Sequence, residues 1–503
     1  MTKHIEDVLT GATQIQPPWT DPDLPPDQFL YDRMGPWPQP APAYPMIRPP
    51  EVLNIPPIEA VSWKSTIGRR YEKTVLEYTV PAFIEGTYEK LCGVPLPTDS
   101  QFIQIMTHTV YSRFLRQEAP GSTDWISDFT AMELLTPLPG TYCAPVVSRF
   151  RKANNGFSCI EIKFLKTATR SEELVVTPTD KAWNLAKVYA LQGAAYHALF
   201  VVHPTLHFPM DSINAITKTA IPMMHPLYQA LIPHTTYTLQ LDNTVLESSW
   251  SVVNNKVHET WFDPLTAEGY NIKQLFGVGY SGYRGLKAYP AFDYMAPWMD
   301  ADILYGKCLQ AYFVPFLVFA TKIASVIPKT DPYVKRWADY CSANVRGFPD
   351  GSAIFEEDNL AKAMAIYMWD VSVAHGADHY SFGKGIALTN KFLRLRRPPP
   401  VDIYDGVDVK TVSDLVTAED LGRAILANDM VFSVITMEPN LIDTKYAFTD
   451  KALINATDEF HANLRSVDTM VRTIMPEFMR LEPDSDVHHS YPYDLTIPAS
   501  IQF

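Results

Sequence analysis

The sequence contains few cysteines and no pattern that would organise them. Its 503 residues include only five, and no two of them stand in a CxxC motif: Cys92, Cys143, Cys159, Cys308 and Cys341. An odd and scattered set favours neither a disulfide framework nor a zinc-thiolate site. The first residues also lack the basic and apolar regions of a secretory signal. We therefore expect reduced thiols in a cytoplasmic protein.

Positive charge is scarce as well. Lys and Arg total 42 against 56 Asp and Glu, which gives a formal net charge of −14. Binding to phosphate backbones needs clustered basic side chains, and the densest cluster here is only Arg394, Arg396 and Arg397. We interpret this cluster as part of a solvated loop. The charge balance argues against a nucleic-acid partner.

Long hydrophobic runs are missing too. The longest, residues 311–320, contains Pro315 and has about half of the roughly 20 residues that a membrane span needs. Hydrophobic residues nevertheless make up 47% of the chain, which is ample for a deep core. We expect a folded, soluble protein, with peripheral membrane contact left open.

The order of patterns along the chain predicts a mainly α protein. Residues 1–60 hold 14 of the 42 prolines and predict an extended N-terminal arm. Residues 61–503 predict one large helical domain, with a small β excursion within 116–182. Thr417 and Asp420 are placed to cap a helix. Helical patterns cover 63–115 with a break at Pro95 and Pro97, and then 183–197, 299–326, 357–380 and 417–480.

Two histidines stand out in the segment from Trp369 to Tyr380. His375 and His379 are four residues apart in a proline-free, largely apolar stretch, so an α-helix places both imidazoles on one face. Such a pair can hold a divalent transition metal. The alternative is that both rings donate to backbone carbonyls or to a carboxylate such as Asp378.

Histidines are also frequent just after the helical pattern that begins at Trp183. Five of the 13 histidines fall within 38 positions: His197, His203, His207, His225 and His234.

Several stretches, in this order, resemble the catalytic domain of the lipoxygenases. Trp183-Asn-Leu-Ala-Lys is similar to the family's Trp-x-x-Ala-Lys signature, and it is followed by His203 and His207. His225-Pro-Leu-Tyr-Gln-Ala-Leu-Ile-Pro-His234 resembles the family's His-Pro-x-x-x-x-Leu-x-Pro-His run. Ile497-Pro-Ala-Ser-Ile-Gln-Phe503 resembles the family's C-terminus. The resemblance extends from about residue 120 to the end and implies a helical lipoxygenase-like domain.

The resemblance also implies a metal site with iron, or alternatively manganese, as the cofactor. Its ligands would be His203, His207, His375, His379 and the terminal carboxylate of Phe503, and Asp211 would match the family's acidic residue after the second histidine. No protein side chain would be the reacting base, because metal-bound water or hydroxide is expected in that role. The implied partners are a hydrophobic small molecule, such as a polyunsaturated fatty acid, and O2. His197, His225 and His234 are better interpreted as core histidines.

The sequence departs from the family in several places. His203 and His207 are four apart, where the family commonly has five and a π-type bulge, so an unbulged helix would align this pair. We expect the Pro-rich arm in place of the N-terminal β-barrel of plant and animal members. Other departures are Phe382 for a frequent Gln, Thr236 and Glu247 near frequent Arg positions, and Phe503 for Ile or Val. These departures leave a second hypothesis open, a lipoxygenase-like protein that binds an apolar ligand without turning it over.

Overall fold

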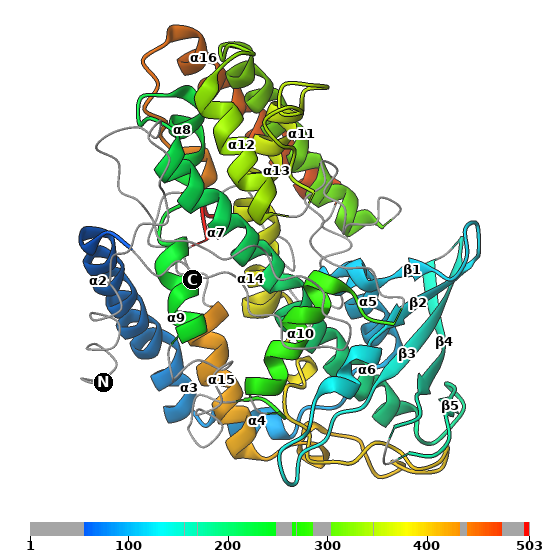
Figure 1. Cartoon of the computed structure of the whole chain (residues 1–503). Coiled ribbons are helices and arrows are strands. Elements are labelled where there is room, and N and C mark those ends of the chain that lie inside the picture. Colours follow the sequence, from blue (N-terminus) through cyan, green and yellow to red (C-terminus); the bar gives the residue numbers. More distant parts are fainter. Residues whose placement is uncertain are drawn as a thin grey trace.

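The computed structural model describes residues 55–154, 156–167, 170–247, 264–267, 269–284, 303–345, 347–432, 440–474 and 497–501. Figure 1 shows a mainly helical body with a small sheet at one side. This confirms the predicted fold class. Nearly all of the predicted N-terminal arm lies outside the described residues.

The first described helices are drawn in the blue part of the colour scale in Figure 1. They are α2 (Pro57–Thr74), the π-helical η1 (Val75–Thr79), α3 (Val80–Ile84), α4 (Thr87–Cys92), α5 (Asp99–His108) and the 3-10 helix η2 (Val110–Phe114). The chain leaves helical conformation between α4 and α5, at the predicted break. α2 begins inside the segment predicted as an extended arm, because Pro57 occupies the first helical turn, where its missing N–H costs nothing.

The predicted β excursion is a five-stranded antiparallel sheet in sequential order. Its strands are β1 (Arg116–Gln117), β2 (Asp124–Asp128), β3 (Val146–Ala153), β4 (Gly156–Phe164) and β5 (Leu174–Val176), with the 3-10 helix η3 (Thr130–Leu134) between β2 and β3. Trp125 pairs with Phe150 across β2 and β3, and a register shift at Arg149/Phe150 bends β3 against β4. Strand β4 contacts α5 and α6, so one face of the sheet rests on the helical body.

Two long helical runs pass through the centre of the molecule. The first consists of α6 (Trp183–Tyr196), the π-helical η4 (His197–Val202) and α7 (His203–Ala220). The second consists of α13 (Asn359–Trp369), the π-helical η6 (Asp370–Ala374), α14 (His375–Tyr380) and the π-helical η7 (Ser381–Gly385). α7 contacts both η6 and α14, so the two runs lie side by side.

Other helices surround this pair. They are α8 (Pro226–Leu231), η5 (Ile232–His234), α9 (Thr238–Glu247), α10 (Gly269–Ser281), α11 (Leu304–Ser325), α12 (Pro332–Asn344), η8 (Leu388–Asn390), η9 (Val412–Asp414), α15 (Ala418–Phe432), η10 (Leu441–Asp443) and α16 (Lys451–Ile474). α11 packs on α13 and α16, α12 packs on α7, and α15 packs on α4. The predicted cap of α15 is confirmed, since Thr417 Oγ1 accepts from Asp420 N at 3.1 Å and Asp420 Oδ2 accepts from Thr417 N at 3.1 Å.

Two details differ from the sequence predictions. The basic cluster is not a solvated loop, because Arg394 is 6% exposed and Arg396 forms a two-pronged ion pair with Asp420 at 2.9 Å. The helix predicted from Glu357 begins at Asn359, because Glu357 and Asp358 have positive φ angles of 45° and 61°.

Two helical stretches are long and apolar enough to cross a membrane by length and composition alone. Trp183–Ala220 is the central run described above, and its most apolar window is 100% buried within the protein. Leu304–Ser325 continues through Pro315 for 22 residues, and its window is 44% buried. Burial of the first stretch is what a core helix of a globular protein shows.

Candidate metal centre

The first pair of histidines lies at the start of α7. His203 and His207 occupy its first and second turns, in regular α-helix, as the spacing of four predicts. The π-helical segment η4 ends at Val202, directly before His203. The π-type distortion is therefore present in this chain, but it precedes the histidine pair instead of lying within it.

The second pair lies on α14, between two π-helical segments. His375 opens this short helix after η6, and His379 follows one turn later, before η7. His375 is 1% exposed and His379 is 4% exposed. The apolar sequence around them buries the helix on all sides, so both imidazoles face the interior next to α7.

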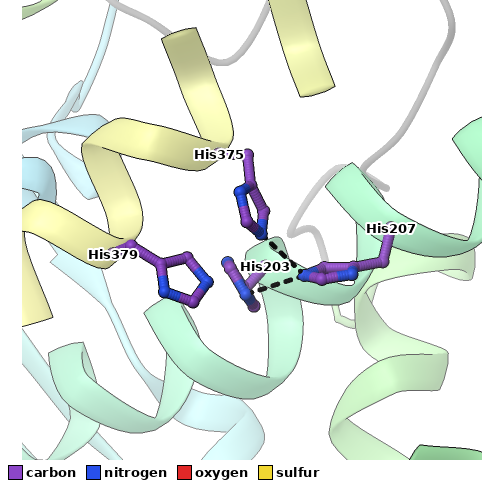
Figure 2. Close-up of side chains that lie close together, drawn as sticks. All are labelled: His203, His207, His375 and His379. Carbon is purple, nitrogen blue, oxygen red and sulfur yellow. Dashed lines mark hydrogen bonds between the residues drawn. The ribbon is translucent and has the colours of Figure 1, made fainter. Parts of the chain in front are cut away.

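The four imidazoles meet between α7 and α14. One nitrogen from each of His203, His207, His375 and His379 lies within 4.8 Å of the others. Figure 2 shows the rings converging from the two helices on one small volume. His203 Nε2 lies 2.9 Å from His207 Nε2, and His207 Nε2 lies 3.1 Å from His375 Nε2.

Carboxylates hold the outer nitrogens of the first pair. His203 Nδ1 lies 3.0 Å from Asp378 Oδ2, and His207 Nδ1 lies 2.9 Å from Asp242 Oδ1. A carboxylate can only accept, so each Nδ1 carries the proton and donates it. The tautomer is thereby fixed, and both Nε2 atoms present lone pairs toward the centre.

Burial keeps these imidazoles neutral at pH 7. Desolvation lowers the pKa of His203 and of His207 to about 4, even though nearby carboxylates act in the opposite direction. Burial, followed by the neighbouring histidines, lowers the pKa of His375 and of His379 well below the usual value. Neutral imidazole is the form that binds a metal.

The short distance between the Nε2 atoms of His203 and His207 is explained by a cation bound between them. Two neutral imidazoles with their protons on Nδ1 face each other with lone pairs only, which is repulsive at 2.9 Å. Metal–nitrogen bonds of about 2.1 Å at right angles would place two nitrogens about 3 Å apart. His375 adds a buried Nδ1 with no hydrogen-bond partner among the described residues. The residues therefore fit a bound transition metal.

The carboxylate of Asp378 is itself held by a buried arginine. Arg113 donates through a terminal guanidinium nitrogen to Asp378 Oδ1 at 2.6 Å, and both side chains are almost fully buried. Burial alone would raise the pKa of Asp378, but Arg113 and then His203 outweigh it, so the pKa lies below its usual value. Asp378 is thus an anion shared between a cation and an imidazole.

The carboxylate of Asp242 has a second carboxyl group beside it instead. Asp211, on α7, hydrogen bonds to Asp242 and to Thr238, and it is 4% exposed. Burial, followed by the charge of Asp242, raises the pKa of Asp211 well above its usual value. Burial also raises the pKa of Asp242 to about 7, although the hydrogen bond with Asp211 acts in the opposite direction. Two coupled carboxyl groups therefore lie behind His207.

The predicted fifth ligand, Phe503, lies outside the described residues. The segment just before it is described, and its residues Ile497 and Ile501 are fully buried. A Cβ atom added to Gly376 would lie 3.4 Å from Pro498 Cδ, so this segment runs against the helix that carries His375 and His379. His234 fastens it by a 2.7 Å hydrogen bond from Nδ1 to Ala499 O.

The three histidines interpreted as core residues have partners outside the cluster. His197 Nδ1 lies 2.8 Å from Gly193 O, and His234 Nε2 lies 2.8 Å from Tyr446 OH. His225 Nε2 lies 3.3 Å from Asp331 Oδ2. None of the three belongs to the group of four.

The departures from the lipoxygenase pattern fall around the site. Phe382 is buried one turn after His379, with its ring centroid 6.0 Å from that of Tyr111. It therefore supplies an apolar wall where a Gln would supply an amide. The carbonyl of Thr236 accepts a hydrogen bond from Ser500 Oγ at 3.4 Å, so this position also touches the C-terminal segment. Glu247 ends α9, and its side chain lies outside the described residues.

Two residues with roles at the site gave no signal in the sequence. Arg113 comes from η2 and Asp242 from α9, and neither belongs to a local motif. Asp378 was considered only as a partner for its neighbours His375 and His379, whereas it holds His203 on the other helix.

The comparisons with known proteins show likeness to lipoxygenases. No family model matches the sequence. The mouse (Mus musculus) polyunsaturated fatty acid lipoxygenase ALOX12 is 22% identical over 324 residues, which cover 57% of this chain and 45% of that protein. The human (Homo sapiens) hydroperoxide isomerase ALOXE3 is 22% identical over 297 residues, which cover 53% of this chain and 38% of that protein. The chain thus spans less than half of the length of either relative.

Solved structures show the same fold. A lipoxygenase crystallised anaerobically with arachidonate superposes with a TM-score of 0.68 at 14% identity, covering 100% of this chain and 81% of the other. The fold is therefore lipoxygenase-like. This shared fold and the sequence likeness to the two relatives confirm the resemblance noted in the sequence.

Proposed function

We propose that this protein is a non-haem metal oxygenase that adds O2 to a hydrophobic substrate, such as a polyunsaturated fatty acid. The proposed metal is iron, with manganese as the alternative. The proposed protein ligands are His203, His207, His375 and His379, together with the terminal carboxylate of Phe503. One observation carries this proposal. The Nε2 atoms of His203 and His207 lie 2.9 Å apart and face each other with lone pairs.

The chemistry of the donor set supports a redox metal. Neutral imidazoles and a carboxylate suit Fe(II) and Mn(II), and such a metal when bound would supply the one-electron chemistry that activates a weak C–H bond toward O2. The protein contributes the fixed orientation of each ring. Its helices place the nitrogens before the metal arrives, so little of the binding free energy is lost in ordering them.

The surroundings of the cluster support an apolar substrate. Phe382 and Tyr111 are fully buried and pack ring to ring beside α14. Such a wall excludes water and offers no hydrogen bond to a polar substrate. The relatives support the same class of substrate, since one is named for polyunsaturated fatty acids and one solved structure holds arachidonate.

The proposal is tested by metal analysis and oxygen uptake together. Protein purified without added metal should contain close to one iron or manganese per chain, and it should consume O2 when arachidonate is supplied. Protein that arrives empty and refuses both metals would overturn the proposal. It would favour the binding hypothesis if it still held arachidonate.

Rearrangement of a hydroperoxide is a second candidate reaction. It is favoured by the match to a hydroperoxide isomerase, which is as strong in identity as the match to the oxygenase. The same preparation separates the two reactions. Loaded protein that consumes a fatty-acid hydroperoxide without O2 uptake is an isomerase, whereas O2 uptake with the parent fatty acid identifies the oxygenase.

The role of His379 can be tested by its replacement with asparagine. His379→Asn exchanges a strong imidazole donor for a weaker amide oxygen, so we expect the metal to remain while its electron paramagnetic resonance spectrum changes. His197→Asn is the matched control, because His197 is also buried but bonds to Gly193 O away from the cluster. A spectrum that His379→Asn leaves unchanged would show that His379 is not a ligand.

A further inference from the structure

Two of the four histidines in the cluster have a carboxylate on the nitrogen that faces away from the centre. The two carboxylates differ in what surrounds them. Asp378 receives an ion pair from Arg113 at 2.6 Å, so its charge is largely offset. Within the described part of the chain, Asp242 forms no ion pair with Lys or Arg. Its Oδ1 lies 2.9 Å from His207 Nδ1.

A second carboxyl group lies beside Asp242. Asp211 and Asp242 are hydrogen bonded to each other and both are buried, at 4% and 2% exposure. Asp242 lies on the far side of the His207 ring from the centre of the cluster, since it accepts from Nδ1 while Nε2 faces the other histidines.

We propose that Asp242 is a positioning residue that sets the redox preference of the metal site through His207. A carboxylate that accepts the Nδ1 proton makes the imidazole a stronger donor and fixes its ring. A stronger donor stabilises the more highly charged metal. Asp242 therefore favours the oxidised metal, and it does so more than Asp378, because no guanidinium neutralises it. This inference rests on the metal site proposed above.

The main variant is Asp242→Asn, which is nearly isosteric. Its amide oxygen still accepts from His207 Nδ1, so the ring orientation is retained while the charge on that contact is removed. Because Asp211 lies beside Asp242, the double variant Asp211→Asn with Asp242→Asn removes both carboxyl groups behind His207. Asp331→Asn is the matched control, since Asp331 holds His225 outside the cluster and asparagine also caps a helix.

The readouts are metal affinity, by competition with a chelator in each oxidation state, and the midpoint potential of the loaded protein. For Asp242→Asn we expect affinity for the metal to fall about 10- to 100-fold. Affinity for the oxidised state should fall about tenfold more than that for the reduced state, which is a rise of about 59 mV in the one-electron potential. The double variant should shift the potential further in the same direction. Asp331→Asn should change neither quantity.

The outcomes separate this inference from the proposed function. Wild-type protein that takes up no metal would overturn the metal site itself. Wild-type protein that loads normally, with a potential that neither Asp242→Asn nor the double variant changes, would overturn only the role of Asp242. Equal losses of affinity in both oxidation states would reduce Asp242 to a structural support and would also overturn the proposal.

Discussion

His375→Ala is expected to abolish metal retention and leave the fold intact. His375 Nε2 lies 3.1 Å from His207 Nε2, and its Nδ1 has no hydrogen-bond partner among the described residues. Removal of this ring therefore strips one donor from the cluster without leaving a protein group unpaired. Loss of an outer partner alone costs about 10- to 100-fold in metal affinity, so loss of the ring itself should cost more than about 100-fold.

Metal content and the far-ultraviolet circular dichroism spectrum are to be measured on the same sample. His225→Ala is the matched control, because His225 is a histidine of the same chain that bonds to Asp331 and lies outside the cluster. The control should keep its metal. Full metal occupancy in His375→Ala would show that His375 is not a ligand, whereas a lost helical spectrum would show that the ring is needed for folding.

The parts of the site that sequence could predict are those set by helix geometry. His203 and His207, and likewise His375 and His379, are each one helical turn apart, so the spacing alone predicts that each pair shares a face. The sequence also predicted strands in the region 116–176, since alternation and turns are local patterns. That the two pairs meet came from the family resemblance and not from any local rule.

The parts that sequence could not predict depend on contacts between distant segments. Arg113 and Asp378 are 265 positions apart, and they meet only because η2 packs beside the helix that carries the second pair. No spacing rule pairs Asp242 with His207, which lie 35 positions apart on different helices. Arg394 was misread for the same reason, because it donates from Nε to Leu265 O, 129 positions away. Charge in the sequence does not reveal which charges the fold buries.

A second large effect is expected at the C-terminus, where we propose that the carboxylate of Phe503 completes the site. Support comes from the segment before it, because Ile497 and Ile501 are fully buried and His234 holds Ala499 O at 2.7 Å. Phe503 follows this anchored segment two residues after Ile501. The test compares a chain that ends at Phe503 with one that carries a single additional Gly.

The added Gly keeps every side chain but displaces the carboxylate by about 3.5 Å, the length of one extended residue. That displacement exceeds what a metal–oxygen bond tolerates, which is about 0.2 Å. We therefore expect the extended chain to lose metal or oxygen uptake almost completely. Phe503→Ile is the matched control and should keep both, since it changes the side chain and leaves the carboxylate in place. Equal metal content and oxygen uptake in the extended and unextended chains would show that the terminus is not a ligand, and the four histidines would then be the whole protein contribution to the site.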